Sequence, residues 1–451
     1  MVKNGRIGLM AKPILIQNRR QLLSAMGAAV LAPALGGPVR GQAQAETLLL
    51  RATAATIALR PDALETRVWA LRAPMRGLTP RFKLGSELTI TLQNDLPVPI
   101  ALDWRGLDGV SAVEPLVARS SLAAGATTTF AANLRHAGTS LCDLRLLEDG
   151  VGLPLRPLPV IVEESQTYGD RDEVFLVEDW QLRADGTVAM PGLPLGQTQS
   201  IYTVNGHISP EVAVRSGERL RLRFINAFQR RIVALKIEGQ DVRVMALDSE
   251  PAEPFLARNS AVVLAPGGRA DALVDVSDPS GRTSEILLHD GNDVRVVARL
   301  VVTDDPPLRP SPLAPATALP SNGLPTQLDL RNALHVELEL SGPAWVPPAS
   351  FAASSPAFRT IPGRVVVLAL TNSAKIATVF HLHGHHFRLL DRLDDGWKPY
   401  WLDTLAVEPG QTQRIAFAAE YAGRWLLESV ANDWAAPRLL RCYSIEQEKR
   451  T

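Results

Sequence analysis

Residues 85–94 read Gly-Ser-Glu-Leu-Thr-Ile-Thr-Leu-Gln-Asn, and this stretch decides the fold. Apolar and polar side chains alternate along it, which is typical of a β-strand with one buried face. Similar runs occur at 217–226 and 363–372, and in all three the interval from Gly to Asn is nine residues. Two further glycines recur after each run: Gly106, Gly239 and Gly384, then Gly125, Gly267 and Gly410. Three ordered copies predict three tandem β domains.

The rest of the chain agrees with an all-β fold. The expected strands are short and separated by Gly, Pro and Asn turns, as in Greek-key sandwiches or barrels. A length of 451 residues suits about three domains. Seven prolines within 306–325 indicate a stiff linker. We therefore predict domains at 46–165, 166–305 and 326–451, with the linker 306–325 before the last.

The first 45 residues have the features of an export signal. Arg19 and Arg20 form a paired-arginine motif, followed by an apolar, Ala-rich run and by small residues at positions 43 and 45. This is similar to a bacterial twin-arginine signal, starting at Met1 or Met10. The apolar run is too short to span a bilayer, and no later segment is long and apolar enough to do so. We expect a periplasmic protein with no membrane span after signal removal.

Composition excludes several classes of protein. Forty-seven basic residues balance 47 acidic ones, and aromatic residues make up 5%, so a nucleic-acid surface is not expected. Two cysteines exclude a disulfide-dense scaffold and a Cys-rich zinc site. Cys142 and Cys442 could form one disulfide or remain as thiols, and sequence alone leaves both possibilities open.

Several motifs resemble the three-domain multicopper oxidases, which are built from cupredoxin domains. Phe380-His381-Leu382-His383-Gly384 resembles the copper motif of their third domain. The other matching segments are 202–206, 264–271, 401–404 with Val407, Pro409 and Gly410, and 423–426. The resemblance covers essentially all of the chain after the signal. It implies three tandem cupredoxin-like Greek-key domains.

The resemblance also implies a blue-copper site and a three-copper cluster, together held by about ten histidines and one cysteine. The chain has only eight histidines, so it cannot supply the full set. Carried over residue by residue, the cluster positions hold Asp103, Arg105, Asp143, Arg145, His381, His383 and Glu428. The blue-copper positions hold Thr378, Ser429, Trp434 and Leu439. Ser429 stands where the family has the thiolate that accepts the substrate electron, which a hydroxyl cannot replace.

We interpret the cluster positions as ion pairs that fill the space of the lost copper. The expected pairs are Arg105 with Asp143, Arg145 with Glu428, and His381 with Asp103, because guanidinium suits carboxylates bidentately. The alternative is a set of drifted residues exposed in an opened cavity. No metal is expected, and if one binds, its ligands are His381, His383 and Asp103. His385 and His386 follow the turn glycine and are expected to be solvated.

These features are similar to the copper-free, SufI/FtsP-like branch of the family, whose known type supports assembly of the bacterial division machinery. We expect no catalytic residue, no cofactor and an envelope protein as partner. The alternative is an oxidoreductase: a laccase-like copper enzyme, or a metal-binding protein with a reduced site at His381 and His383.

Overall fold

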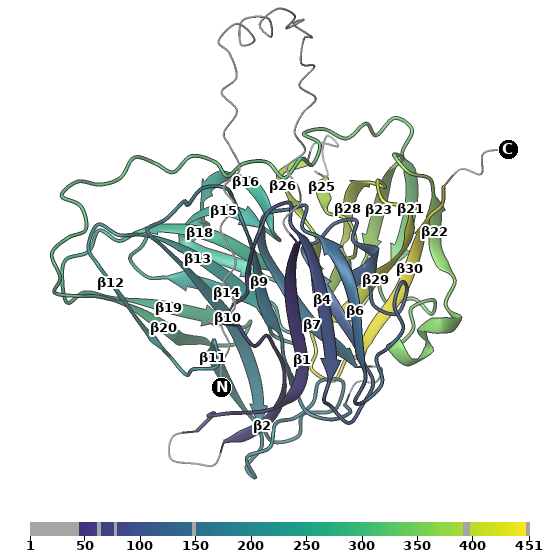
Figure 1. Ribbon diagram of the computed structural model, residues 1–451, viewed down its shortest axis with the longest axis horizontal. Helices are drawn as coiled ribbons and strands as arrows, with labels where there is room; N and C mark the ends of the chain where they lie inside the picture. The colour runs from purple at the N-terminus through teal and green to yellow at the C-terminus, as the bar shows by residue number, and fades with distance from the viewer. Residues whose placement is uncertain (1–44, 61–64, 76–78, 147–149, 391–396, 448–451) are drawn as a thin grey trace, which may run out of the picture. The chain divides into compact units, whose positions relative to one another are not determined.

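The computed structural model describes residues 45–60, 65–75, 79–146, 150–390 and 397–447. The expected export signal, with Arg19 and Arg20, lies outside these residues. The described chain is almost entirely β-structure, arranged as six sheets (Figure 1). The predicted all-β class is therefore confirmed. The domain boundaries given above stay a prediction.

The N-terminal strands form two sheets that enclose one apolar core. These strands are β1 (Ala45–Ile57), β2 (Thr66–Arg72), β3 (Arg81–Lys83), β4 (Glu87–Asn94), β5 (Ile100–Arg105), β6 (Thr127–Asn133), β7 (Gly138–Leu146), β8 (Leu155–Arg156) and β9 (Leu158–Glu163), with a 3-10 turn η1 (Ser111–Val113). The sheets have the orders β6-β4-β1-β2-β8 and β3-β9-β7-β5. Leu88, Ile90 and Leu92 of β4 point into the core, as their alternation predicts.

The middle strands form a second two-sheet sandwich. They are β10 (Arg171–Leu182), β11 (Gln199–Val204), β12 (Glu211–Val214), β13 (Arg219–Asn226), β14 (Val233–Ile237), β15 (Arg243–Leu247), β16 (Glu250–Leu256), β17 (Ala261–Leu264), β18 (Arg269–Asp275), β19 (Thr283–His289) and β20 (Val294–Val302), with η2 (Arg258–Ser260). Their orders are β11-β10-β13-β18-β15-β16 and β12-β20-β19-β14-β17. The core between them includes Phe224 and Leu288.

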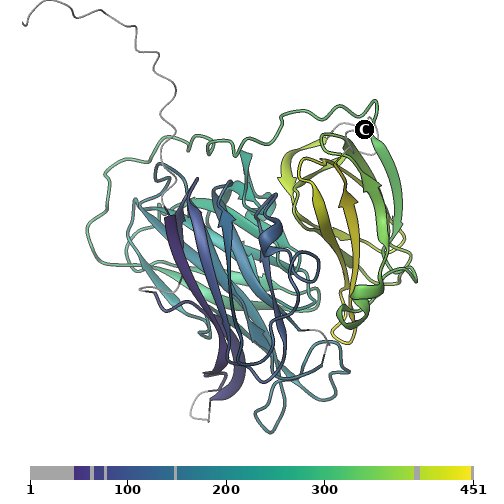
Figure 2. The same cartoon turned by 45° about the vertical axis from the view of Figure 1, so that its right-hand side comes forward.

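The C-terminal strands form a third sandwich, whose two layers are visible in Figure 2. They are β21 (Leu334–Glu339), β22 (Pro356–Thr360), β23 (Val365–Thr371), β24 (Thr378–Leu382), β25 (Phe387–Leu390), β26 (Trp397–Leu402), β27 (Thr404–Val407), β28 (Thr412–Ala418), β29 (Gly423–Ala431) and β30 (Arg438–Ile445), with η3 (Pro348–Ala353). Their orders are β21-β23-β28-β25-β26 and β22-β30-β29-β24-β27. Phe380, Phe387 and Phe417 fill the core between the layers.

The repeated asparagine performs the same task in all three sandwiches. Asn94, Asn226 and Asn372 are fully buried at the ends of equivalent strands. In each, Oδ1 accepts the N–H of the residue two positions later, while Nδ2 donates to backbone carbonyls of two separate segments. The backbone carbonyl of each asparagine accepts the N–H of the third repeated glycine: Gly125, Gly267 or Gly410. These glycines have φ between +69° and +81°, a region that favours glycine. The sequence repeat is therefore a repeated loop anchor.

The Pro-rich segment 306–325 contains no strand and packs against the sandwiches. Leu319 is buried beside Met245 and Leu273 of the middle sandwich. Asn322 exchanges two hydrogen bonds of 2.9 Å with the backbone of Ala137 in the N-terminal part. The segment therefore fastens these parts together as well as connecting them.

Candidate functional site

Two strand pairs bring the predicted cluster residues together. β5 carries Asp103 and Arg105, and β7 places Asp143 directly opposite Asp103. In the C-terminal sandwich, His381 of β24 lies opposite Glu428 of β29. Residues two apart on a strand share a face, so Asp103 and Arg105 point the same way. All five side chains are buried.

Arg105 lies between two carboxylates. Its Nε atom is 3.5 Å from Asp103 Oδ2, and its Nη2 atom is 3.3 Å from Glu428 Oε1. Its Nη1 atom donates to the carbonyl of Pro266 at 3.2 Å. One buried guanidinium therefore contacts the N-terminal, middle and C-terminal parts of the chain.

His383 is surrounded by carboxylates. Its Nδ1 atom is 3.5 Å from Asp103 and 3.6 Å from Glu114, and its Nε2 atom is 3.6 Å from Glu428. Burial alone would lower the pKa of His383, but the charges of Glu114 and Asp103 outweigh it and raise this pKa to about 10. The surrounding carboxylates therefore favour the imidazolium form of His383 at neutral pH.

The neighbouring His381 behaves in the opposite way. Its ring lies 4.3 Å from that of His383, and its Nδ1 atom is 2.9 Å from the carbonyl oxygen of Asp403 and 3.0 Å from Thr404 Oγ1. Burial, followed by the charges of Arg105 and His383, lowers the pKa of His381 to about 4. His381 is neutral at pH 7, so the two histidines of one motif have different charges.

The ion-pair partners differ from those predicted. Arg105 contacts Asp103 and Glu428 rather than Asp143, and His383 rather than His381 lies beside Asp103. The reason is that Asp103 lies on the same strand face as Arg105, within reach of its guanidinium. Asp143 borders a small cavity together with Arg105 and Glu428. The side chain of Arg145 lies outside the described residues, so its predicted pair with Glu428 stays a prediction.

The predicted blue-copper positions have contacts within the protein. Ser429 Oγ donates to the carbonyl of Leu340 at 2.7 Å, and Trp434 Nε1 donates to that of Met190 at 2.9 Å. Thr378 Oγ1 donates to Asn372 Oδ1 at 3.3 Å. Leu439 packs against the apolar core of the C-terminal sandwich.

Little space remains among the cluster residues. A cavity of about 30 Å³ is bordered by Arg105, Asp143, His381 and Glu428. A second, of about 10 Å³, is bordered by Arg105, His381 and His383. Such volumes hold one or two water molecules. The alternative of exposed residues in an opened cavity does not agree with this packing.

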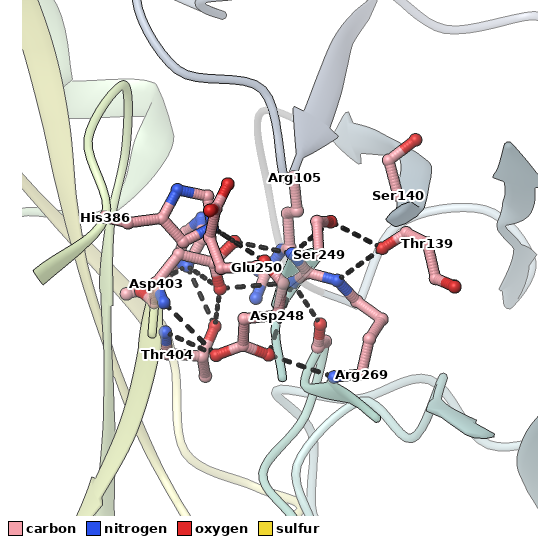
Figure 3. Close-up of polar contacts among 12 residues, drawn as sticks. Arg105, Thr139, Ser140, Asp248, Ser249, Glu250, Arg269, His386, Asp403 and Thr404 are labelled. Atoms are coloured by element: carbon pink, nitrogen blue, oxygen red, sulfur yellow. Dashed lines mark hydrogen bonds and ion pairs between the residues drawn. The ribbon is translucent and has the colours of Figure 1, made fainter. Parts of the chain in front are cut away.

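Sequence reasoning missed a second layer of the network, shown in Figure 3. Arg269 of β18 forms two hydrogen bonds to Asp403, at 3.1 and 2.7 Å. Burial opposes ionisation of Asp403, but Arg269 and His381 hold its pKa well below the usual range. Asp248 accepts the backbone N–H groups of Arg269, Asp403 and Thr404. Arg269 and Asp403 lie in segments that matched the family, and this was the available signal.

The two histidines that follow Gly384 are buried. His385 and His386 are each 2% exposed, so the expectation that they are solvated was wrong. The loop after Gly384 folds onto the N-terminal part, where His386 contacts Asp108.

Cys142 and Cys442 are buried free thiols, which answers the open question of a disulfide. Burial, followed by Asp103 and Asp143, raises the pKa of Cys142 well above its usual value.

Comparison with known proteins assigns the chain to a family. Two models described as multicopper oxidase match residues 171–282 and 325–444, together more than half of the chain. The chain belongs to the multicopper oxidase family. A solved multi-copper oxidase from Pseudomonas thermotolerans covers 89% of this chain and 100% of its own, with a TM-score of 0.75 and 24% identity. The family resemblance and the three cupredoxin-like domains are confirmed.

Two kinds of relative share this fold. The multicopper oxidase MmcO of Mycobacterium tuberculosis is 22% identical over 409 residues, 77% of each chain. The cell division protein FtsP of Pectobacterium atrosepticum is 27% identical over 316 residues, 63% of this chain and 64% of its own. None of the helical turns in the described part of the chain has the length and apolar character needed to cross a membrane.

Proposed function

We propose that this multicopper oxidase family protein is exported and copper-free, and acts through contacts with an envelope protein rather than as an oxidase. The observation that supports this is the placement of Arg105 and the imidazolium of His383 against Asp103 and Glu428. Cations of the protein itself face the carboxylates at the positions where the sequence resemblance places the family's copper cluster.

The donor set does not fit a three-copper cluster. A guanidinium stays protonated and has no lone pair for a metal, so Arg105 cannot be a ligand. His383 is held as an imidazolium, which leaves His381 as the neutral imidazole of the pair. The residual cavities of about 30 and 10 Å³ favour packing by side chains over a site for metal ions and a substrate.

The biological setting of the proposal comes from the relatives and the N-terminal sequence. Relatives named as cell division proteins favour a division or envelope role. The paired arginines at Arg19 and Arg20 favour a periplasmic location reached by the twin-arginine route. We also propose that the expected domain boundaries, 46–165, 166–305 and 326–451, delimit the three sandwiches, which is supported by the grouping of the strands into sheets.

Copper loading separates this proposal from laccase-like oxidation. The purified protein, incubated with copper and a one-electron phenolic donor, is expected to consume no oxygen. It is also expected to show no strong absorption near about 600 nm, where thiolate–copper centres absorb. Ser429→Cys serves as the matched variant, and it should stay colourless because Thr378 and Trp434 supply no imidazole. Oxygen uptake above that of free copper, or a blue colour in the unmodified protein, would overturn the proposal.

Contact with a partner is tested separately. The mature chain, carrying a photo-crosslinker at exposed positions, is expected to give one discrete adduct with an envelope protein in living cells. If crosslinkers at Val263, Val294 and Leu256, which are 67%, 59% and 52% exposed, and at other surface sites give only self-adducts or none, the partner hypothesis fails.

A further inference from the structure

A second cluster of ligand-type side chains lies apart from the copper positions. Asp108 follows β5, His136 precedes β7, and His386 precedes β25. The three are each 4% exposed or less. Each offers one ligand atom, and these atoms lie within 4.8 Å of one another. Two imidazoles and a carboxylate are a donor set that suits zinc.

In each of the three residues, one polar atom lies close to another protein group and a different atom is left for a metal. His386 Nε2 lies 2.6 Å from the carbonyl oxygen of Asp248, so a proton on Nε2 leaves Nδ1 as the ligand atom. His136 Nδ1 lies 2.7 Å from Glu250 Oε1, which leaves its Nε2. Asp108 Oδ2 accepts the backbone N–H of His386 at 3.0 Å, and its Oδ1 faces His386 Nδ1 at 2.8 Å.

This second layer is what metal-binding histidines ordinarily have. A ligating imidazole usually donates its other N–H to a carbonyl or carboxylate, which fixes the tautomer and the orientation of the ring. The Asp248 carbonyl faces His386 and the Glu250 carboxylate faces His136, both from the middle sandwich, and Figure 3 labels Asp248, Glu250 and His386. The arrangement is therefore more specific than a chance group of charged residues.

We propose that Asp108, His136 and His386 bind a divalent cation of the zinc class. Asp108 and the nearby Glu250 would balance its two charges. Zinc lies about 2.0–2.2 Å from nitrogen and oxygen ligands, so the three side chains would adjust their positions around the ion on binding. The bound ion would fasten His386 of the C-terminal sandwich to the N-terminal part.

The cluster at Asp103, His383 and Glu428 is the internal comparison. It also brings ligand atoms within 4.8 Å of one another, but Arg105 lies against two of its members. The charge of that guanidinium opposes a second cation. The competing explanation for the Asp108 cluster is a pair of imidazolium–carboxylate ion pairs, with protons where the metal would be.

Elemental analysis of protein made with and without added zinc tests the proposal. The site is buried, so the ion should enter during folding. Protein from zinc-supplemented cells, purified without chelator, is expected to hold about one zinc per chain and to melt at a higher temperature than zinc-depleted protein. Asp108→Asn and His136→Gln should each lose the zinc and the difference in melting temperature, while Glu428→Gln should keep both.

Zinc contents of the unmodified protein and of the variants can each overturn the proposal. Substoichiometric zinc after supplementation, or zinc content unchanged in Asp108→Asn and His136→Gln, would show that the cluster holds protons instead. Loss of zinc in Glu428→Gln but not in Asp108→Asn would place the ion in the other cluster. If the variants fail to fold, cobalt-grown unmodified protein decides: visible absorption of a nitrogen- and oxygen-ligated Co²⁺ is expected, and its absence refutes the site.

Discussion

Arg105 is the residue on which the buried charges depend most directly. Replacing Arg105 by Ala removes the guanidinium group that contacts both Asp103 and Glu428. Removing one member of a buried ion pair typically costs roughly 3–5 kcal/mol. We expect Arg105→Ala to lower the free energy of unfolding, measured by urea titration, by about this amount. Arg331→Ala is the control, because its pair with Asp329 is exposed at the surface and should not change stability measurably.

A double-mutant cycle tests the pairing itself. Arg105→Met combined with Glu428→Gln should destabilise the protein by less than the sum of the two single changes, because the contact between these two groups can be lost only once. The difference should be about 0.5–3 kcal/mol, the range found for residues in one network. Plain additivity would mean that the 3.3 Å contact between Arg105 and Glu428 contributes no coupling.

At this scale the sequence predicts which residues meet better than how they pair. The family motifs placed Asp103, Arg105, His381, His383 and Glu428 in one region, and the structure brings them together. The partners could not be predicted, because an arginine side chain can reach several carboxylates on one strand face. The burial of His386 was missed for a related reason: its partner Asp108 is 278 residues away in the chain.

At the scale of strands and loops, the repeated asparagine is the feature on which stability depends. Asn372→Ala removes the Nδ2 donor that holds the carbonyls of Ile376 and Val407. Each buried group left unpaired costs about 1–3 kcal/mol. We expect a clear fall in melting temperature, measured by circular dichroism. Asn332→Ala, at an exposed turn of the same sandwich, should leave the melting temperature unchanged.

The spacing of Gly and Asn was visible in the sequence for a physical reason. A loop anchor needs a side chain that both donates and accepts, next to a backbone with positive φ, so few residue types serve. Sequence reasoning therefore found the three β units. It could not find that 306–325 is fastened by Leu319 and Asn322, because proline content reveals stiffness but not contact partners.

For the whole molecule, the buried His383 makes stability depend on pH. Glu114 and Asp103 raise the pKa of His383 to about 10 against the effect of burial. A raised pKa stabilises the fold fully below the unfolded value of about 6.5 and loses that effect as pH approaches 10. We expect the free energy of unfolding to fall steadily from pH 6.5 to 10.

The comparison variant for this pH dependence is His383→Gln. It should be less stable at pH 6.5 and should show a shallower decline, since the imidazole whose pKa is raised is gone. Identical slopes in denaturant titrations of the two proteins across this pH range would mean that His383 is not protonated in the native state.

The proposed export signal can be tested by mutation of its paired arginines. Arg19→Lys together with Arg20→Lys is expected to leave unprocessed protein in the cytoplasm, because the twin-arginine route reads the paired guanidinium groups. Cell fractionation and immunoblotting measure this, with Lys12→Arg as the control that preserves charge outside the motif. Normal processing of the double variant would indicate the general secretory route.

The order in which the chain is synthesised gives the Arg269–Asp403 contact a further consequence. Arg269 leaves the ribosome more than a hundred residues before its partner Asp403. The separation in sequence between Asp103 and its partner His383 is larger still. Until these C-terminal segments are synthesised, Arg269 and Asp103 lack these partners, at surfaces that are buried in the folded protein. A nascent chain therefore cannot complete this buried network of ion pairs before the final strands are translated. Any export route that accepts only finished proteins would thus have a built-in sign of completion.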